Sequence, residues 1–264
     1  MSPSRGEAPS TWCSNLEGIL GRAEFTDGWH ELAVTCLRAA SGWAPKLSTP
    51  GESFCIVRQS PRLLRWHAEV GTFPLGSAQE ADPAVASLAE VLDGVARDDA
   101  PELFAKHSRL RFEVGNVISR DFTDHKAQGY TSTVHRDLDE TAVGNLARRG
   151  ASVFLNFWVP FSPIVSDHLG ICLPSSVDLP AQVGAFKGLT GDRTALRWDK
   201  GQRWVMAADL KPGDVLIWQS DAVYHANLAP PSHEGDQEGV TEAALRRKSV
   251  DLRLWYFGTA AADR

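Results

Sequence analysis

From about residue 110 onward, the chain is a series of short apolar segments separated by clusters of Gly, Pro, Asp and Ser. The segments are rich in β-branched and aromatic residues, which favour strands. Examples are "LRFEVGNVIS", "ASVFLNFWVPF", "RWVMAADL", "DVLIWQS" and "KSVDLRLWYFG". Many short strands separated by turn signals are typical of a sandwich or barrel. The pattern therefore predicts a mainly β unit over residues 111–258.

The first 110 residues have a mixed pattern and are expected to buttress the β unit, so that residues 1–264 form a single domain. Apolar residues at helical spacing predict a helix over residues 26–42, ending at Gly42. Asp82-Pro83 is a good start for a second helix. Residues 53–71, "SFCIVRQSPRLLRWHAEVG", predict two strands around a Ser-Pro turn. The fold class expected is thus mainly β with flanking helices. The apolar positions behind the two helices are Trp29, Leu32, Ala33, Cys36 and Leu37, and Val85, Leu88, Leu92 and Val95.

Charge and composition exclude several classes of partner. The net charge is -6, and the longest basic run is Arg246-Arg247-Lys248, which disfavours a nucleic-acid partner. No apolar run approaches the roughly 18 residues of a membrane span, and the first residues lack the apolar segment of a signal peptide. The four cysteines are widely spaced, so we expect reduced thiols and a cytoplasmic location. A small-molecule partner fits this composition best.

The stretch "TSTVHRDLDETAVGN" contains two competing patterns. His-Arg-Asp-Leu begins the catalytic loop of protein kinases, but the asparagine required five residues after the aspartate is replaced by Ala142. The Gly-rich loop and the Asp-Phe-Gly triplet of kinases are also missing from the sequence. The second pattern is His-x-Asp: on a strand, His135 and Asp137 point to one side and Arg136 to the other. A mononuclear iron site would then need a second histidine from a distant strand.

The second histidine has a strong candidate in His225, which follows the turn and strand "KPGDVLIW". At this point the sequence resembles the Fe(II)/2-oxoglutarate-dependent dioxygenases, and more narrowly their phytanoyl-CoA hydroxylase-like branch. The resemblance covers residues 110–258 in order. It rests on His135-Arg136-Asp137, "FWVPF", "LGICLPSS", "KPGDVLIW", His225 and Arg247-Lys248-Ser249.

The resemblance implies a double-stranded β-helix (jelly-roll) core with Fe(II) held by His135, Asp137 and His225. It also implies 2-oxoglutarate as cosubstrate, with its far carboxylate on Arg247 and a hydrogen bond from Ser249. Arginine suits that place because its planar fork matches a carboxylate. The activity implied is O2-dependent oxidation of an unactivated C–H bond in a small molecule of specialised metabolism. Hydroxylation is the simplest outcome, and desaturation, cyclisation and epimerisation are open to the same class.

Four further residues are candidates for the pocket. Asn156 lies on an apolar strand, where its amide needs a partner, and is predicted to contact 2-oxoglutarate or substrate. Trp158 and Arg120 are predicted substrate contacts, with core packing as the alternative for the tryptophan. Arg253 is predicted as a second anion contact for substrate, with pairing to Asp251 or another acid as the alternative.

The sequence departs from the family in the spacing before Arg247, and two alternative functions stay open. The spacing from His225 to Arg247 is longer than in the family, and the excess is the polar segment Ala229–Ala243, either a lid or a solvated loop. The aspartate at position 137 disfavours halogenation, since iron halogenases of the superfamily carry a small residue there. The alternatives in function are a non-redox jelly-roll binding protein and a cupin-like iron oxygenase that does not use 2-oxoglutarate.

Overall fold

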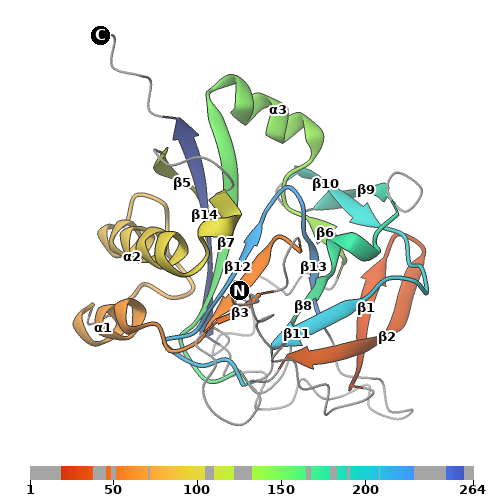
Figure 1. Ribbon diagram of the computed structural model, residues 1–264, viewed down its shortest axis with the longest axis horizontal. Helices are drawn as coiled ribbons and strands as arrows, with labels where there is room; N and C mark the ends of the chain where they lie inside the picture. Colours follow the sequence, from red (N-terminus) through yellow and green to blue (C-terminus); the bar gives the residue numbers. More distant parts are fainter. Residues whose placement is uncertain are drawn as a thin grey trace, which may run out of the picture.

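The computed structural model describes residues 19–37, 46–48, 52–70, 72–104, 110–121, 133–164, 168–178, 183–188, 191–207, 209–228 and 248–258. Two β-sheets face each other in this part of the chain, with helices beside one of them (Figure 1). The eight-stranded sheet contains, in spatial order, β1 (Ile19–Phe25), β2 (Gly28–Leu37), β11 (Trp204–Ala207), β8 (Leu169–Cys172), β13 (Tyr224–Asn227), β6 (His135–Arg136), β10 (Gly191–Leu196) and β9 (Val183–Gly188). The six-stranded sheet contains β3 (Lys46–Ser48), β4 (Phe54–Val57), β12 (Val215–Gln219), β7 (Ala151–Pro160), β14 (Lys248–Gly258) and β5 (Leu110–Asp121).

The chain crosses repeatedly from one sheet to the other. Strands β5, β7, β12 and β14 belong to the six-stranded sheet, and the strands that follow or precede them, β6, β8, β11 and β13, belong to the other. This alternation winds the strands into a double-stranded β-helix, and the prediction of a jelly roll is confirmed. Because β7 is covered on both faces, its apolar run "FLNFWVP" is nearly continuous instead of alternating, and nine of its ten positions are buried.

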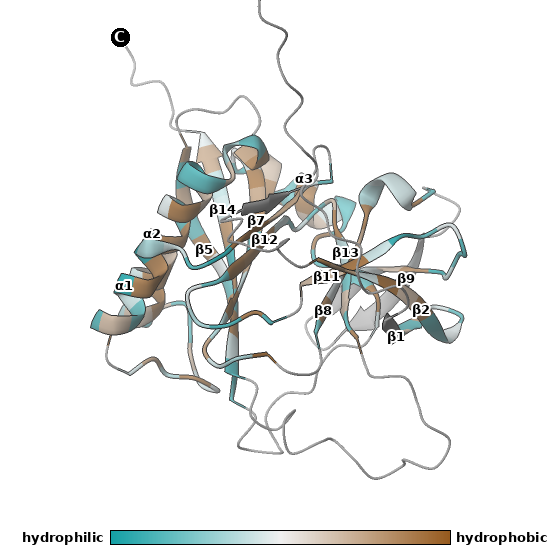
Figure 2. Cartoon of the chain, turned by 60° about the horizontal axis from the view of Figure 1, so that its bottom comes forward, coloured by the Kyte–Doolittle hydropathy of each residue, from teal (hydrophilic) through white to brown (hydrophobic). Residues whose placement is uncertain are grey.

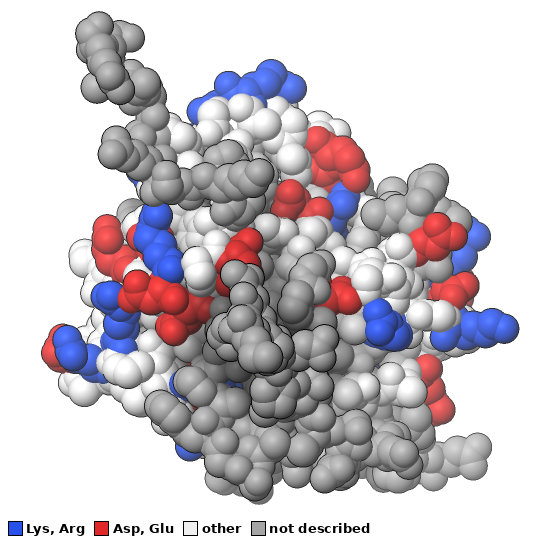
Figure 3. All heavy atoms as spheres, viewed as in Figure 1, with Lys and Arg blue, Asp and Glu red and all other residues white. Residues whose placement is uncertain are grey.

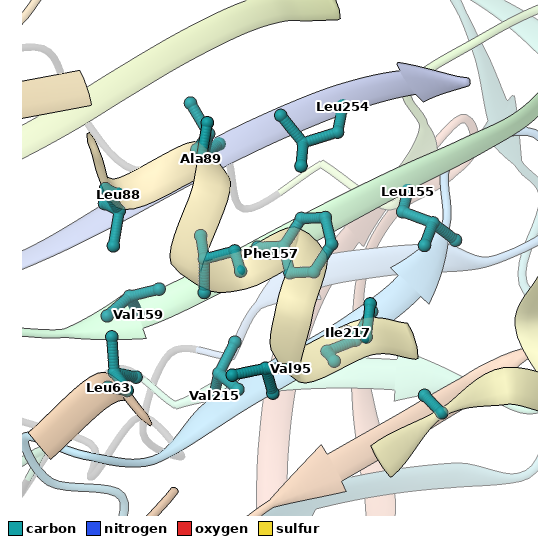
Figure 4. Close-up of a cluster of buried hydrophobic side chains, with 14 of the residues drawn as sticks. Leu63, Leu88, Ala89, Val95, Leu155, Phe157, Val159, Val215, Ile217 and Leu254 are labelled. Carbon is teal, nitrogen blue, oxygen red and sulfur yellow. The ribbon is translucent and has the colours of Figure 1, made fainter. Parts of the chain in front are cut away.

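Helices cover the outer face of the six-stranded sheet. The helices are α1 (Pro61–Glu69) and α2 (Pro83–Asp99), and α2 confirms the helix predicted from Asp82-Pro83. Figure 4 shows the apolar side of α2, including Leu88 and Val95, over Phe157, Ile217 and Leu254 of three neighbouring strands. In Figure 2 these helices carry both hydrophilic and hydrophobic residues, as expected for one buried face and one wet face.

The helix predicted over residues 26–42 is wrong, because β1 and β2 form an antiparallel hairpin there. Gly28 makes the turn with a φ of 120°, a backbone conformation that favours glycine. Along β2 the buried residues Leu32, Val34 and Cys36 alternate with exposed neighbours, which is the period of a strand. The apolar but exposed Ala33 concealed that alternation in the sequence.

The two strands predicted for residues 53–71 are half right. Residues Phe54–Val57 form β4, but the second segment is helix α1. Pro61 occupies its first turn, where a missing N–H costs nothing. Leu63 and Trp66 are buried one helical turn apart, so tertiary packing selects the helix. A third helix, α3 (Glu140–Arg148), follows the His-x-Asp stretch and was not predicted; Asp139 caps it by accepting a hydrogen bond from the Ala142 amide at 2.7 Å.

The Pro-Gly-Asp turn before β12 is confirmed and is held by a buried carboxylate. Asp214 is completely buried and accepts hydrogen bonds from the amides of Gln59 at 2.8 Å and Lys211 at 3.0 Å. The Arg58 guanidinium pairs with the same carboxylate at 3.1 Å. The turn therefore ties β4 to β12 and fixes where β12 and the following β13 begin.

The surface of the described residues carries both charges. Figure 3 shows acidic and basic side chains interspersed over one face of the molecule. Among the described helices, none has the length and apolar character that crossing a bilayer requires.

Candidate metal centre

Three residues with metal-binding side chains meet between the sheets. His135 on β6 lies directly opposite His225 on β13, and Asp137 follows β6 by one residue. One ligand atom from each of the three lies within 4.8 Å of the others. All three side chains are buried, and within the described part of the chain they form the one such group of His, Cys, Asp or Glu side chains.

The backbone on both sides of the His-x-Asp stretch is fixed by neighbouring elements. The Val134 amide donates a hydrogen bond to the Glu24 carbonyl at 2.7 Å, which attaches the start of the stretch to β1. The Leu138 amide donates to the Ser220 carbonyl at 3.2 Å, which attaches its end to the turn after β12. Strand alternation then places His135 and Asp137 on the same side, as the sequence predicted.

Hydrogen bonds to backbone carbonyls set the orientation of both imidazole rings. His135 Nδ1 lies 2.8 Å from the Thr133 carbonyl oxygen, and His225 Nδ1 lies 3.5 Å from that of Val223. A carbonyl only accepts, so Nδ1 of each ring carries a proton, and in the neutral form of the ring the lone pair is on Nε2. The two Nε2 atoms face Asp137, at 3.5 Å from Oδ1 and 3.4 Å from Oδ2. Both rings therefore present their lone pairs to one point beside the carboxylate.

The carboxylate of Asp137 is held from the opposite sheet. Arg253 Nη2 on β14 donates to Asp137 Oδ1 at 2.5 Å, and Asn156 Nδ2 on β7 donates to Oδ2 at 2.6 Å. Asn156 and Arg253 are themselves cross-strand partners. The Ser220 hydroxyl donates in turn to Asn156 Oδ1. The ligand side chains thus come from or next to the eight-stranded sheet, and the groups that hold the aspartate come from or next to the six-stranded sheet.

The electrostatics of the group favour the protonation states that bind a metal. Burial by itself would raise the pKa of Asp137, but the charge of the Arg253 guanidinium beside it outweighs burial and holds that pKa well below its usual range. Burial lowers the pKa of His225 to about 3, although Asp137 opposes this. At neutral pH the site therefore offers an ionised carboxylate and a neutral imidazole, as metal ligation requires.

Several other predicted site residues lie on strands β5, β7 and β14 of the six-stranded sheet. Arg253 pairs with Asp137 and not with its neighbour Asp251. The alternative that Arg253 pairs with an acid therefore describes the structure, and the acid is one of the three candidate metal ligands. Trp158 is buried on β7 opposite Asp251. Arg120 on β5 lies opposite Ser249 on β14, whose side chain is completely buried.

Several predictions fall outside the described residues. Arg247 and the segment Ala229–Ala243 are among them, so the cosubstrate arginine and the lid stay predictions. Arg136, by contrast, is described and does point away from the group. It pairs with Glu140 at 2.5 Å and its guanidinium lies over the Tyr224 ring.

Two contributors were missed in the sequence. Ser220 ends the apolar run "DVLIWQS", and only its polarity in an otherwise buried region could have drawn attention to it. Trp218 lies with its ring centroid 4.9 Å from that of His225 and is fully buried. A tryptophan in an apolar strand gives no signal that separates a neighbour of the site from ordinary core.

Comparison with solved structures agrees with the fold. The chain is similar to the iron and alpha-ketoglutarate-dependent endoperoxidase NvfI, with a TM-score of 0.54 and 16% identity over 95% of this chain and 99% of that one. A second structure of this enzyme, in a different conformation, gives 0.53 and 17% over 96% and 100%. A tryptophan-to-phenylalanine variant gives 0.51 and 17% over 81% and 82%. No family model matches the chain, and no curated protein matches it in sequence.

Proposed function

We propose that this protein is an Fe(II)- and 2-oxoglutarate-dependent oxygenase that oxidises a C–H bond of a small molecule. The observation that carries the proposal is the buried group His135, Asp137 and His225, whose two Nε2 atoms converge on one carboxylate inside a jelly roll. Two imidazoles and one carboxylate on one side of a metal leave positions open for cosubstrate and oxygen. The order of motifs along residues 110–258 also supports the phytanoyl-CoA hydroxylase-like branch.

The residues present fit a divalent iron. Imidazole nitrogen and carboxylate oxygen are ligands that Fe(II) accepts, and the carbonyl contacts of His135 and His225 hold the tautomers it needs. When bound, the metal and 2-oxoglutarate would supply the oxidising chemistry, with succinate and carbon dioxide as by-products. The chain itself orients the three ligands, excludes water from them by burial, and keeps Asp137 ionised.

The proposed place for the far carboxylate of 2-oxoglutarate is the inward face of β14 and β5. Ser249 Oγ is buried and makes no hydrogen bond within the described residues, so it has a donor to offer. Arg120 lies opposite Ser249 in the register of β5 and β14, which brings a second cationic side chain to the same face. Arg247, two residues before Ser249, lies outside the described residues, and the family resemblance supports it as the arginine for this carboxylate. Together these residues would give the carboxylate a hydroxyl and a planar fork.

Succinate formation tests the proposed function directly. Purified protein is incubated with Fe(II), ascorbate, 2-oxoglutarate and a panel of small apolar molecules, and succinate is measured by mass spectrometry. We expect turnover that depends on both Fe(II) and 2-oxoglutarate. Product masses then separate hydroxylation from desaturation. Absence of succinate, with tight retention of a panel molecule, would favour the non-redox binding protein.

Replacement of Arg247 tests the cosubstrate. We expect Arg247→Ala to weaken 2-oxoglutarate binding by roughly 10- to 150-fold, because a charge-assisted bidentate contact contributes about 1.5–3 kcal/mol. Arg246→Ala is the matched control, since it removes the neighbouring arginine and should leave affinity unchanged. Calorimetric titration of the metal-loaded protein without oxygen gives both constants. Equal affinity in Arg247→Ala and wild type would remove that arginine from the cosubstrate site, and the cupin-like alternative would gain.

A further inference from the structure

We infer that Asn156 and Ser220 are positioning residues that hold the Asp137 carboxylate in the orientation a metal ion requires. The inference rests on the proposed metal site and goes beyond it. The sequence predicted Asn156 as a contact to 2-oxoglutarate or substrate, whereas its amide donates to Asp137 Oδ2 at 2.6 Å. Its role would then be exerted through the metal ligand and not on the bound organic molecules.

The two oxygens of Asp137 are restrained from two directions. Asn156 restrains Oδ2, and Arg253 restrains Oδ1 at 2.5 Å. A carboxylate restrained at both oxygens cannot turn about its terminal bond, so the lone pairs left on it keep a fixed direction toward His135 and His225. The Nε2 atoms of those two rings lie 3.4–3.5 Å from the Asp137 oxygens, close enough for all three side chains to bind one ion. A preset ligand orientation lowers the ordering cost of metal binding.

The direction of the hydrogen bonds follows from chemistry alone. An ionised carboxylate only accepts, so Asn156 must turn its amide N–H₂ toward Asp137 and its Oδ1 away. Oδ1 then accepts from the Ser220 hydroxyl, which lies on its far side. If the serine hydroxyl is removed, Oδ1 loses its described partner and the amide is free to turn. Ser220 therefore acts on the orientation of the Asp137 carboxylate indirectly, through the side chain of Asn156.

Ser220 is itself anchored on both sides of the site. Its amide donates to the Phe154 carbonyl on β7 at 2.9 Å, and its carbonyl accepts from the Leu138 amide at 3.2 Å. Asn156 and Ser220 are both completely buried. Buried amide and hydroxyl groups destabilise a fold unless they are hydrogen-bonded. A purely structural role, joining the two sheets, would satisfy them equally well, so the test must separate stability from metal affinity.

The test measures metal binding without turnover. Wild type, Asn156→Leu, Ser220→Ala and the double variant are titrated with Mn(II) and Co(II) in competition with a chelating dye, and the visible spectrum of the Co(II) protein reports the ligand geometry. Leucine has nearly the shape of asparagine and donates no hydrogen bond. We expect Asn156→Leu to weaken binding by roughly 10- to 100-fold and to change the Co(II) spectrum. We expect Ser220→Ala to weaken it by a smaller factor.

Non-additivity is the decisive outcome. Because Ser220 acts through Asn156, the double variant should bind metal as Asn156→Leu does, with no further loss. Ser119→Ala is the matched control: it removes another buried serine hydroxyl, one that accepts from the Ala78 amide at 3.1 Å on the helix-covered side of β5. It should leave metal affinity unchanged. Ser220→Ala deletes a single atom beyond Cβ, so it keeps the test informative if Asn156→Leu folds poorly.

The other outcomes separate the inference from the proposed function. If wild type binds metal and folded Asn156→Leu or Ser220→Ala binds it equally well, the positioning role is overturned while the proposed metal site stands. Fully additive losses in the double variant would overturn the relay from Ser220 through Asn156. If wild type itself binds neither ion, the proposed function fails and the inference fails with it.

Discussion

The two sheets contribute different things to the same site. The eight-stranded sheet and the residue after β6 supply the three side chains that could bind a metal, His135, Asp137 and His225. The six-stranded sheet supplies the large helix-covered core on its outer face and the groups that hold Asp137 on its inner face. The eight-stranded sheet therefore supplies the candidate metal ligands, and the six-stranded sheet supplies the groups that hold Asp137 in place.

This difference shows how a small site can be stabilised at a distance. The strand that carries His135 is only two residues long and pairs with β10 and β13 at few positions. The Arg253 and Asn156 side chains hold Asp137, the residue after that strand, from the long strands β14 and β7, which pack on α2. The orientation of the Asp137 carboxylate is thus supported by the sheet that packs against α2. Removal of a ligand, a cavity in the core and a change of pH would each test this division between the sheets.

Loss of a ligand should have the largest effect. His225→Ala removes one of three donors, and we expect it to abolish stoichiometric binding of Fe(II) or Mn(II), measured by metal analysis after gel filtration. The protein should stay folded, because the change removes one buried polar ring and leaves the large helix-covered core intact. His67→Ala, a histidine of helix α1 outside the group, should bind metal as wild type does. Stoichiometric metal in His225→Ala would refute the His-Asp-His group.

A core change in the six-stranded sheet should act on stability and not on metal affinity. Phe157→Ala opens a cavity between β7 and α2, and we expect the free energy of unfolding to fall by about 3–5 kcal/mol. Ile217→Val, a milder change on the same face, should cost about 0.5–1.5 kcal/mol. Urea unfolding measures both. If folded Ile217→Val loses metal affinity tenfold, the division between support and chemistry is wrong.

Acid should weaken the metal-free fold through His225. The unfolded chain takes up a proton there near pH 6.5, but the folded chain does so only near pH 3, where burial has placed the pKa. The unfolded state therefore binds more protons between these values, and the free energy of unfolding falls as the pH drops, by up to about 1.4 kcal/mol per pH unit. Urea unfolding at pH 7, 6 and 5 in a chelating buffer measures the slope. His225→Gln should reduce the slope but not abolish it, because burial also lowers the pKa of His67. An unchanged slope would contradict the assignment to His225.

Elements were predicted correctly from the sequence where the pattern that indicates them spans only a few neighbouring residues. Helix α2 and the late strands were predicted from patterns within a dozen residues, where Pro83 and the apolar positions agree. The hairpin of β1 and β2 was mistaken for a helix, because a buried strand with apolar residues on its exposed side also matches helical spacing. Its pairing with β11, far along the chain, decided the outcome.

The sequence by itself determined the fold class and the three residues His135, Asp137 and His225, because residue type and strand alternation are local properties that two-residue spacing preserves. Only the tertiary structure decided what holds them. Asn156, Ser220 and Arg253 lie 19 to 116 residues from Asp137. The hydrogen bonds from Asn156 and Arg253 to Asp137 exist because two sheets face each other, and the one from Ser220 to Asn156 exists because β12 and β7 are neighbours in one sheet. A hydrogen bond forms only when donor and acceptor are placed to within a few tenths of an ångström. Spacing along the chain does not specify that placement before the sheets have packed.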